Sequence, residues 1–229
     1  GTDFGIGDDN PPGAHRQRTP DHLVAQLDRA GIAWKSYQEG SDGATGALVA
    51  AGRYAPKHNP LVYFDDLTGG GDPHSAGCIA HVRPYGELAG DLAGDTVARY
   101  NFITPDLCHD MHDACRPTND GIAQGDAWLA AEVPKILASP AYRRGGALLI
   151  TWDEGEGGDG PIGMLVLSPF AKVGYRNTIR YTHSSTLATL QRIFGVGPPL
   201  GDAATATDLG DLFVAPATPA TPRVGVPGR

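Results

Sequence analysis

The chain has 229 residues, of which 41% are hydrophobic and 19% charged, a composition typical of a globular protein rather than a disordered one. Its formal charge of −8 offers no attraction to a phosphate backbone, so a nucleic-acid partner is disfavoured. No apolar run reaches the roughly 18 residues needed to span a bilayer, so no transmembrane segment is expected, and the opening GTDFGIGDDN lacks the features of a signal peptide.

The predicted elements alternate between helices and strands. In chain order they are a helix over 19–31, strands over 32–37 and 61–64, a glycine-interrupted helix over 86–94, a strand over 100–103, a long helix over 119–138, strands over 146–152 and 164–167, and a helix over 184–194. Thr19 is the expected N-cap of the first helix and Gly31 its stop. The strand over 146–152 is almost wholly apolar, which is typical of a strand buried on both faces of a parallel sheet.

This alternation predicts an α/β fold with a mostly parallel central sheet and helices on both faces. The sequence shows no internal repeat and no domain boundary, so a single domain is expected over residues 1–213. The Pro-rich residues 214–229 are expected to form a disordered tail.

Two of the three cysteines, Cys108 and Cys115, bracket the segment CHDMHDAC. A disulfide between them would fix the intervening His and Asp residues and is typical of an exported protein. The alternative is three buried thiols. With an odd count, Cys78 is either free or has its partner outside this chain.

An acidic pair, Asp153 and Glu154, directly follows the apolar strand over 146–152 and precedes a glycine-rich loop. Ligands of open α/β sheets bind outside the carboxyl ends of the strands, and carboxylates there can hold a divalent cation. The alternative is an ordinary polar turn after a strand, and spacing alone does not separate the two readings.

Three further segments carry histidines. TPDLCHDMHD follows the strand over 100–103, and His109 and His112 would share a face if this segment is helical. In PKHNP, the side chains of Lys57, His58 and Asn59 can all donate to phosphate oxygens, although a turn with a chance histidine is the alternative. In YTHSS, His183 lies where the last helix begins, with Thr182 or Ser184 as the expected N-cap.

Taken in order, these segments resemble the bacterial phosphoesterase family that contains secreted acid phosphatases and phospholipases C. The segments that carry the resemblance are GTDFGIGDD, LDRAGIAWKSYQE, YAPKHNPLVYF, NFITPDLCHDMHD, GDAWLAAEVPKIL, ALLITWDEG and HSSTLATL. The resemblance runs to about Phe213 and is closest to the phosphatidylinositol-3-phosphatase-like branch. It implies a fold like that of alkaline phosphatase and metal-dependent hydrolysis of phosphate esters by a secreted enzyme.

The resemblance also implies roles for individual residues. Asp153 and Glu154 match the acidic pair that ligates the metal, and His58, His112 and His183 match histidines expected to act on the phosphoryl group. Lys57, Asn59 and His109 are expected to bind substrate, and Asp106 and His109 match the family less closely than the other residues. The substrate is expected to be a phosphate-ester small molecule or a phospholipid headgroup.

The sequence departs from the family at its start. Family members begin with a strand that ends in a Glu-Asn-His-like metal motif, followed by a segment with a Ser or Thr nucleophile, and neither is found here. The chain is therefore expected to be a C-terminal part with an incomplete sheet and metal site. A phosphomonoesterase is the favoured reading. The alternatives are a phospholipase C-type phosphodiesterase and an inactive fragment that binds metal or anions.

Overall fold

The computed structural model describes residues 4–43, 47–72, 74–155 and 160–214. The predicted tail thus lies outside the described residues except for Val214, and the single-domain assignment stays a prediction. Within these residues, no helix is long and apolar enough to cross a bilayer.

A three-stranded parallel sheet organises the fold. It consists of β1 (Trp34–Gln38), β2 (Val82–Pro84) and β3 (Tyr100–Thr104), in the order β2-β1-β3. Ser36 of β1 pairs with Val82 on one side and with Phe102 on the other. Because the strands are parallel, the residues that follow β1 and β3 meet at one edge of the sheet.

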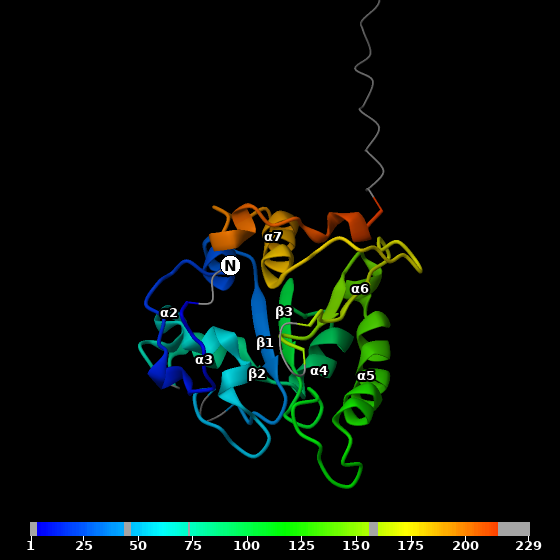
Figure 1. The fold of residues 1–229 in the computed structure, drawn as a ribbon. Helices are drawn as coiled ribbons and strands as arrows, with labels where there is room; N and C mark the ends of the chain where they lie inside the picture. The colour runs from blue at the N-terminus through cyan, green and yellow to red at the C-terminus, as the bar shows by residue number, and fades with distance from the viewer. Residues whose placement is uncertain (1–3, 44–46, 73, 156–159, 215–229) are drawn as a thin grey trace, which may run out of the picture.

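Seven α-helices and a second pair of strands are described around this sheet. They are α1 (Leu23–Arg29), α2 (Asp65–Thr68), α3 (Ala76–His81), α4 (Glu87–Ala93), α5 (Gly121–Leu137), α6 (Pro140–Arg143), α7 (His183–Phe194), β4 (Leu148–Thr151) and β5 (Met164–Leu167). Short 3-10 helices are η1 (Pro12–Ala14), η2 (Pro56–His58), η3 (Pro60–Tyr63), η4 (Gly201–Ala204) and η5 (Leu209–Leu212). Figure 1 shows α2 and α3 on one side of the three-stranded sheet and α4, α5 and α6 on the other.

Alternation along β1 gives the sheet a core on each face. Trp34 packs in the larger cluster, which includes Leu27 of α1 and Val62 of η3. Tyr37 points to the other face, where it meets Leu88 and Leu92 of α4. The strand β1 is therefore covered on both faces, and this packing fixes the position of Glu39, the residue that follows it.

The α/β class, the strand over 100–103 and the helices over 86–94, 119–138 and 184–194 are confirmed, with small shifts at their ends. A likeness to alkaline phosphatase stays a prediction. The predicted disulfide between Cys108 and Cys115 is present, and Cys78 is a buried free thiol.

Three predictions about the elements are wrong. Residues 61–64 do not form a strand, because Pro60 starts the 3-10 helix η3; a short apolar run does not distinguish a buried helix from a strand. The first helix starts at Leu23, with the side chain of His22 accepting from the Ala25 amide, whereas Thr19 caps only a turn at Asp21. Finally, β4 pairs antiparallel with β5 and is only partly buried.

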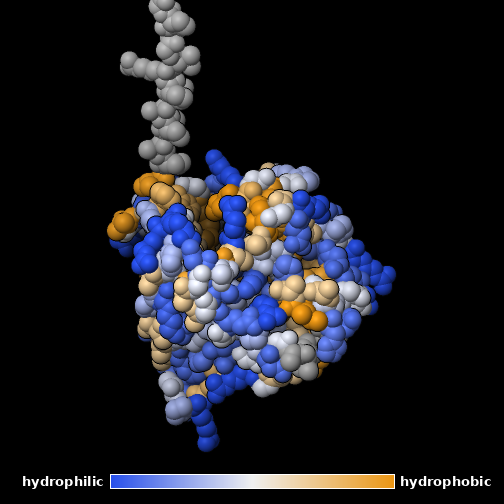
Figure 2. Space-filling model, turned by 180° about the vertical axis from the view of Figure 1, so that it is seen from behind, coloured by the Kyte–Doolittle hydropathy of each residue, from blue (hydrophilic) through white to orange (hydrophobic). Residues whose placement is uncertain are grey.

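The face seen in Figure 2 is mostly hydrophilic, with hydrophobic side chains in separate patches. Exposed hydrophobic side chains include Phe170, Val173 and Ile193. Scattered residues of this kind are normal on a protein surface.

Candidate active site

The turn η2 presents two of the predicted residues, Lys57 and His58. Pro56 occupies its first position, where its fixed φ favours a helical turn and no amide hydrogen is needed. The turn is held against β3 by the hydroxyl of Thr104, which donates to the carbonyl oxygen of His58 over 3.4 Å and accepts from Gln38 of β1.

The loop after β3 presents the other histidines. Asp106 begins it with a carboxylate that accepts from the amides of Cys108 and His109, at 3.0 and 3.2 Å. The disulfide between Cys108 and Cys115 then closes the loop. Within it, Met111 has a φ of +76°, a left-handed conformation that few residues other than glycine adopt and that often marks functional sites.

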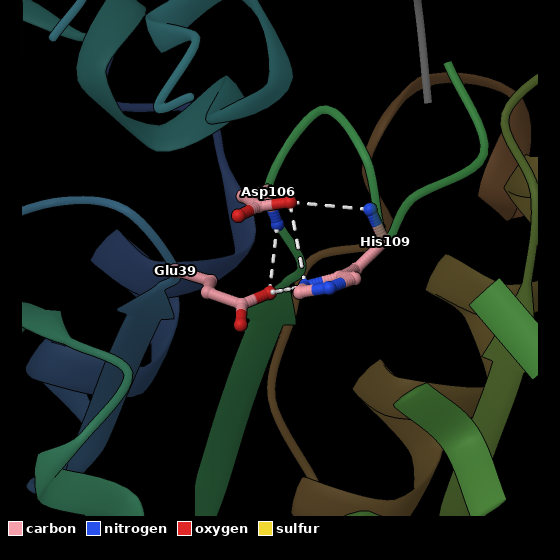
Figure 3. Close-up of side chains that lie close together, drawn as sticks. All are labelled: Glu39, Asp106 and His109. Atoms are coloured by element: carbon pink, nitrogen blue, oxygen red, sulfur yellow. Dashed lines mark hydrogen bonds and ion pairs between the residues drawn. The ribbon is translucent and has the colours of Figure 1, made fainter. Parts of the chain in front are cut away.

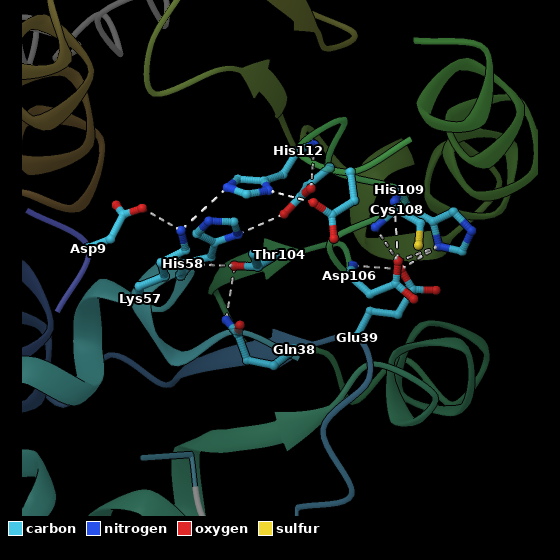
Figure 4. Close-up of polar contacts among 12 residues, drawn as sticks. Asp9, Gln38, Glu39, Lys57, His58, Thr104, Asp106, Cys108, His109 and His112 are labelled. Atoms are coloured by element: carbon cyan, nitrogen blue, oxygen red, sulfur yellow. Dashed lines mark hydrogen bonds and ion pairs between the residues drawn. The ribbon is translucent and has the colours of Figure 1, made fainter. Parts of the chain in front are cut away.

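These two segments meet in a cluster of charged side chains (Figure 4). His58 donates through Nδ1 to the carboxylate of Asp110 over 2.8 Å, and His112 donates through Nδ1 to Asp113 over 3.0 Å. The two imidazole rings lie 5.1 Å apart between centroids. Each carboxylate fixes the orientation of its ring, and no described residue makes a hydrogen bond to Nε2 of His58.

Lys57 supplies a positive charge to this cluster. Its Nζ lies 3.3 Å from Nε2 of His112 and donates to the carboxylate of Asp9 over 2.7 Å. The ammonium group lowers the pKa of Asp9 below its usual value by this hydrogen bond and by its charge. An amine and two oriented imidazoles together make a site suited to a phosphate oxygen.

The acidic pair lies beside the loop after β3. The indole nitrogen of Trp152 donates to the sulfur of Met111 over 3.4 Å, and Asp153 follows directly. His183, the first residue of α7, donates through Nε2 to the backbone carbonyl of Asp153 over 2.7 Å. Thr182 is the N-cap of this helix, in a capping box with Ser185, so one of the two expected caps is correct.

The carboxylates of Asp153 and Glu154 fit a divalent cation. Both residues are exposed, and none of the ion pairs within the described residues involves them. The two carboxylates are adjacent and have no cationic partner among the described residues. They offer the oxygen ligands that hard or borderline divalent ions prefer. The hydrogen bond from His183 reaches the backbone carbonyl of Asp153 and so holds the backbone that carries the pair.

Two predicted residues lie apart from this cluster. Asn59 is fully buried, and its side-chain nitrogen donates to the hydroxyl of Tyr54 over 3.3 Å, inside the turn rather than toward solvent. His109 turns to the other side of its loop, where its Nδ1 contacts Glu39. Neither geometry favours the substrate contact expected from the sequence.

Several residues of these clusters had no predicted role. Asp110 and Asp113 orient the histidines, Asp9 holds Lys57, and Glu39 contacts His109. The sequence could have indicated Glu39, because this acid directly follows the strand β1, much as Asp153 comes shortly after the strand β4. Asp9 lies in a loop segment whose contact with Lys57 spans 48 residues, and local patterns carry no information on such a contact.

Comparison with known proteins decides the family. The sequence matches the Phosphoesterase family over residues 3–197. The chain belongs to this family.

Relatives of the chain include a phosphatidylinositol-3-phosphatase of Mycobacterium tuberculosis, 28% identical over 84% of the chain and 58% of the relative. An acid phosphatase of Aspergillus niger is 27% identical over 88% and 47%, and a probable acid phosphatase of Kluyveromyces lactis is 26% identical over 74% and 41%. The chain thus spans roughly half the length of these relatives, which are hydrolases of phosphate esters by name.

Proposed function

We propose that this chain forms the phosphate-binding side of an active site that hydrolyses phosphate monoesters with the help of a divalent cation. The observation that carries the proposal is the convergence of Lys57, His58 and His112 from two separate segments, each imidazole oriented by its own carboxylate. The acidic pair is joined to the same loop through the contact between Trp152 and Met111.

The chemistry follows from these positions. With Nδ1 of each ring donating to an aspartate, Nε2 of a neutral ring accepts, as Nε2 of His112 does from Lys57. Once the ring takes up a second proton, Nε2 can donate to a phosphoryl oxygen or pass that proton to the leaving group. Lys57 balances negative charge on the substrate, since its side chain is 23% exposed and reaches the ring of His112. A cation held by Asp153 and Glu154 would stabilise charge that develops on the phosphoryl oxygens.

The disulfide supports an extracytoplasmic location, because disulfides persist in oxidising compartments. The substrate class within this proposal is a monoester, in keeping with the names of the relatives. A phospholipase C-type phosphodiesterase would use the same clusters and differ in its leaving-group contacts, so it is kept as an outcome of the test.

The test uses the 229-residue chain with two readouts. Binding of inorganic phosphate is measured by calorimetry, and hydrolysis of p-nitrophenyl phosphate is measured with and without Mn²⁺ or Zn²⁺. His58→Gln and His112→Gln should each weaken phosphate binding and reduce any hydrolysis by about 10²-fold, the usual contribution of a general acid or base. Asp153→Ala should remove the metal dependence.

His74→Gln is the matched control, because His74 is exposed and its side chain makes no contact with another described residue that would link it to this cluster. Faster hydrolysis of bis(p-nitrophenyl) phosphate than of the monoester would favour the phosphodiesterase. Phosphate binding without hydrolysis would support only the binding role. If phosphate affinity is absent, or is unchanged in both histidine variants, the proposal fails.

A further inference from the structure

A second cluster lies on the opposite side of the loop after β3 and takes no part in the proposed hydrolysis. Glu39 follows the last residue of β1, Asp106 comes two residues after the end of β3, and His109 lies on the same loop. Because β1 and β3 are parallel neighbours, their carboxyl ends bring the two carboxylates to one edge of the sheet. Figure 3 shows the three side chains pointing toward one another.

The spacing of the three side chains is that of metal ligands. Nδ1 of His109 lies 2.9 Å from Oε2 of Glu39 and 3.3 Å from Oδ1 of Asp106. One nitrogen or oxygen atom from each residue can be chosen so that all three lie within 4.8 Å of one another. Neighbouring ligands at about 2.1 Å from an ion are themselves about 3.0–3.5 Å apart, so these atoms already approximate one face of a coordination shell.

We propose that Glu39, Asp106 and His109 bind a divalent first-row transition ion such as Zn²⁺ or Mn²⁺, at a site separate from the acidic pair Asp153–Glu154. An imidazole combined with two carboxylates favours these ions over Ca²⁺ and Mg²⁺, which take oxygen ligands almost alone. The inference does not depend on the proposed hydrolysis, because no residue of this cluster is assigned to it.

Surrounding donors hold the candidate ligands in place. Oε1 of Glu39 accepts from the indole nitrogen of Trp128 over 3.1 Å, and Oε2 accepts from the amide of Asp106 over 3.0 Å. The ring of Trp128 also stacks on that of His109 at 6.3 Å between centroids. Outer contacts of this kind orient the ligands of a metal and raise its affinity.

The charges of the cluster also match a divalent ion. Nδ1 of His109 lies near oxygens of two carboxylates, and its hydrogen bond to Oε2 of Glu39 requires that it carry a hydrogen in the metal-free protein. The ion would replace this proton and neutralise both carboxylates. The guanidinium of Arg53 lies 3.8 Å from Oδ2 of Asp106, and because its side chain is half-exposed, solvent screens its charge.

An ion at this site would fasten the loop after β3 to the end of β1. The same loop carries Asp110 and His112, which face the other cluster. The ion would therefore have a positioning role and would not contact the substrate.

The experiment is Zn²⁺ titration by calorimetry of the metal-stripped chain. All proteins carry Asp153→Asn and Glu154→Gln, so that ions at the acidic pair do not contribute. This background should bind one Zn²⁺, and both Glu39→Gln and His109→Gln should weaken binding by at least 10-fold. The matched control is His112→Gln, the same substitution in the same disulfide-closed loop, and it should bind as the background does.

Far-UV circular dichroism and the mass of the oxidised protein verify that each variant is folded with its disulfide intact. Because two different residues are replaced, the loss of one variant to misfolding leaves the other as the test. The proposal is overturned if the background binds no Zn²⁺ up to millimolar concentration. It is also overturned if Glu39→Gln or His109→Gln, when folded, binds as tightly as the background, or if His112→Gln loses as much affinity.

Discussion

His183 donates through Nε2 to the backbone carbonyl oxygen of Asp153 over 2.7 Å, and this contact joins the start of α7 to the acidic pair. The carbonyl of Asp153 is thereby fixed while its carboxylate stays exposed. His183 is thus placed to hold the backbone that carries the acidic pair.

We expect His183→Ala to weaken divalent-ion binding at Asp153 and Glu154 by up to about 10-fold, because the backbone that carries the two carboxylates loses a contact that holds it in place. Mn²⁺ titration by calorimetry measures this in a background that carries both Glu39→Gln and His109→Gln, which removes two of the three candidate ligands of the other cluster. His74→Ala, in an exposed turn, should leave the affinity unchanged. Equal affinity in the His183→Ala variant would show that the hydrogen bond does not position the pair.

The disulfide gives a second prediction, because it closes a loop that contains Asp110 and His112. Cys108 and Cys115 are separated by seven positions, and a loop of this length predicts a loss of about 2–3 kcal/mol of unfolding free energy when the bond is absent. Cys115→Ala should show this loss in urea denaturation and should also bind phosphate more weakly.

Dithiothreitol supplies the control for this variant. It should destabilise the unmodified chain by a similar amount and have no further effect on Cys115→Ala. A chain whose stability and phosphate affinity are both insensitive to reduction would contradict the prediction.

The sequence predicted those parts of the fold that depend on local signals. The strand that became β3, the long helix α5 and the capped helix α7 were recognised because their periodicity and caps lie within a few residues. Residues 61–64 were predicted wrongly as a strand. Their apolar side chains, such as the buried Val62, can be buried in a 3-10 helix as well as in a strand, so the apolar run does not distinguish the two. The antiparallel pairing of β4 was missed because an apolar run does not identify its partner.

The site was predictable to the same extent. His112 and Asp153 were predicted as site residues because each lies in a polar segment that follows a predicted strand. His58 was predicted because it lies with Lys57 and Asn59 in a turn. Glu39 was missed because its contact with His109 spans 70 residues and depends on the parallel pairing of β1 with β3. Only the folded arrangement divides the loop after β3 into two sides, one for His112 and one for His109.

A third prediction concerns the larger core. Leu27 is completely buried, in the cluster that contains Trp34 and Val62. Leu27→Ala should lower the unfolding free energy by about 2–4 kcal/mol, because it removes buried methyl groups and leaves a cavity. Ile122→Ala, at a residue that is 73% exposed on α5, is the control and should change stability by less than about 0.5 kcal/mol in the same urea titration. Similar effects of the two substitutions would place Leu27 outside the core.

A fourth prediction concerns Asp211, whose carboxylate gathers three donors near the end of the described chain. It accepts from Tyr175 and Asn177 at 2.7 Å and from Lys172 at 3.1 Å. The hydrogen bond from Tyr175 and then those from Asn177 and Lys172 lower the pKa of Asp211 to about 2. The folded-state pKa is thus below the value of 3.8 expected for the unfolded chain.

A lowered pKa makes the contribution of Asp211 to stability dependent on pH in a defined direction. The contribution is fully present above about pH 4 and is lost as the pH falls toward 2. Asp211→Asn should therefore lower Tm relative to the unmodified chain at pH 7, and the difference should shrink progressively between pH 4 and pH 2. Thermal unfolding followed by circular dichroism measures the difference at each pH. Asp21→Asn, at an exposed turn, should show no such trend. A Tm difference for Asp211→Asn that stays constant across this interval would mean that the three donors do not favour the ionised carboxylate.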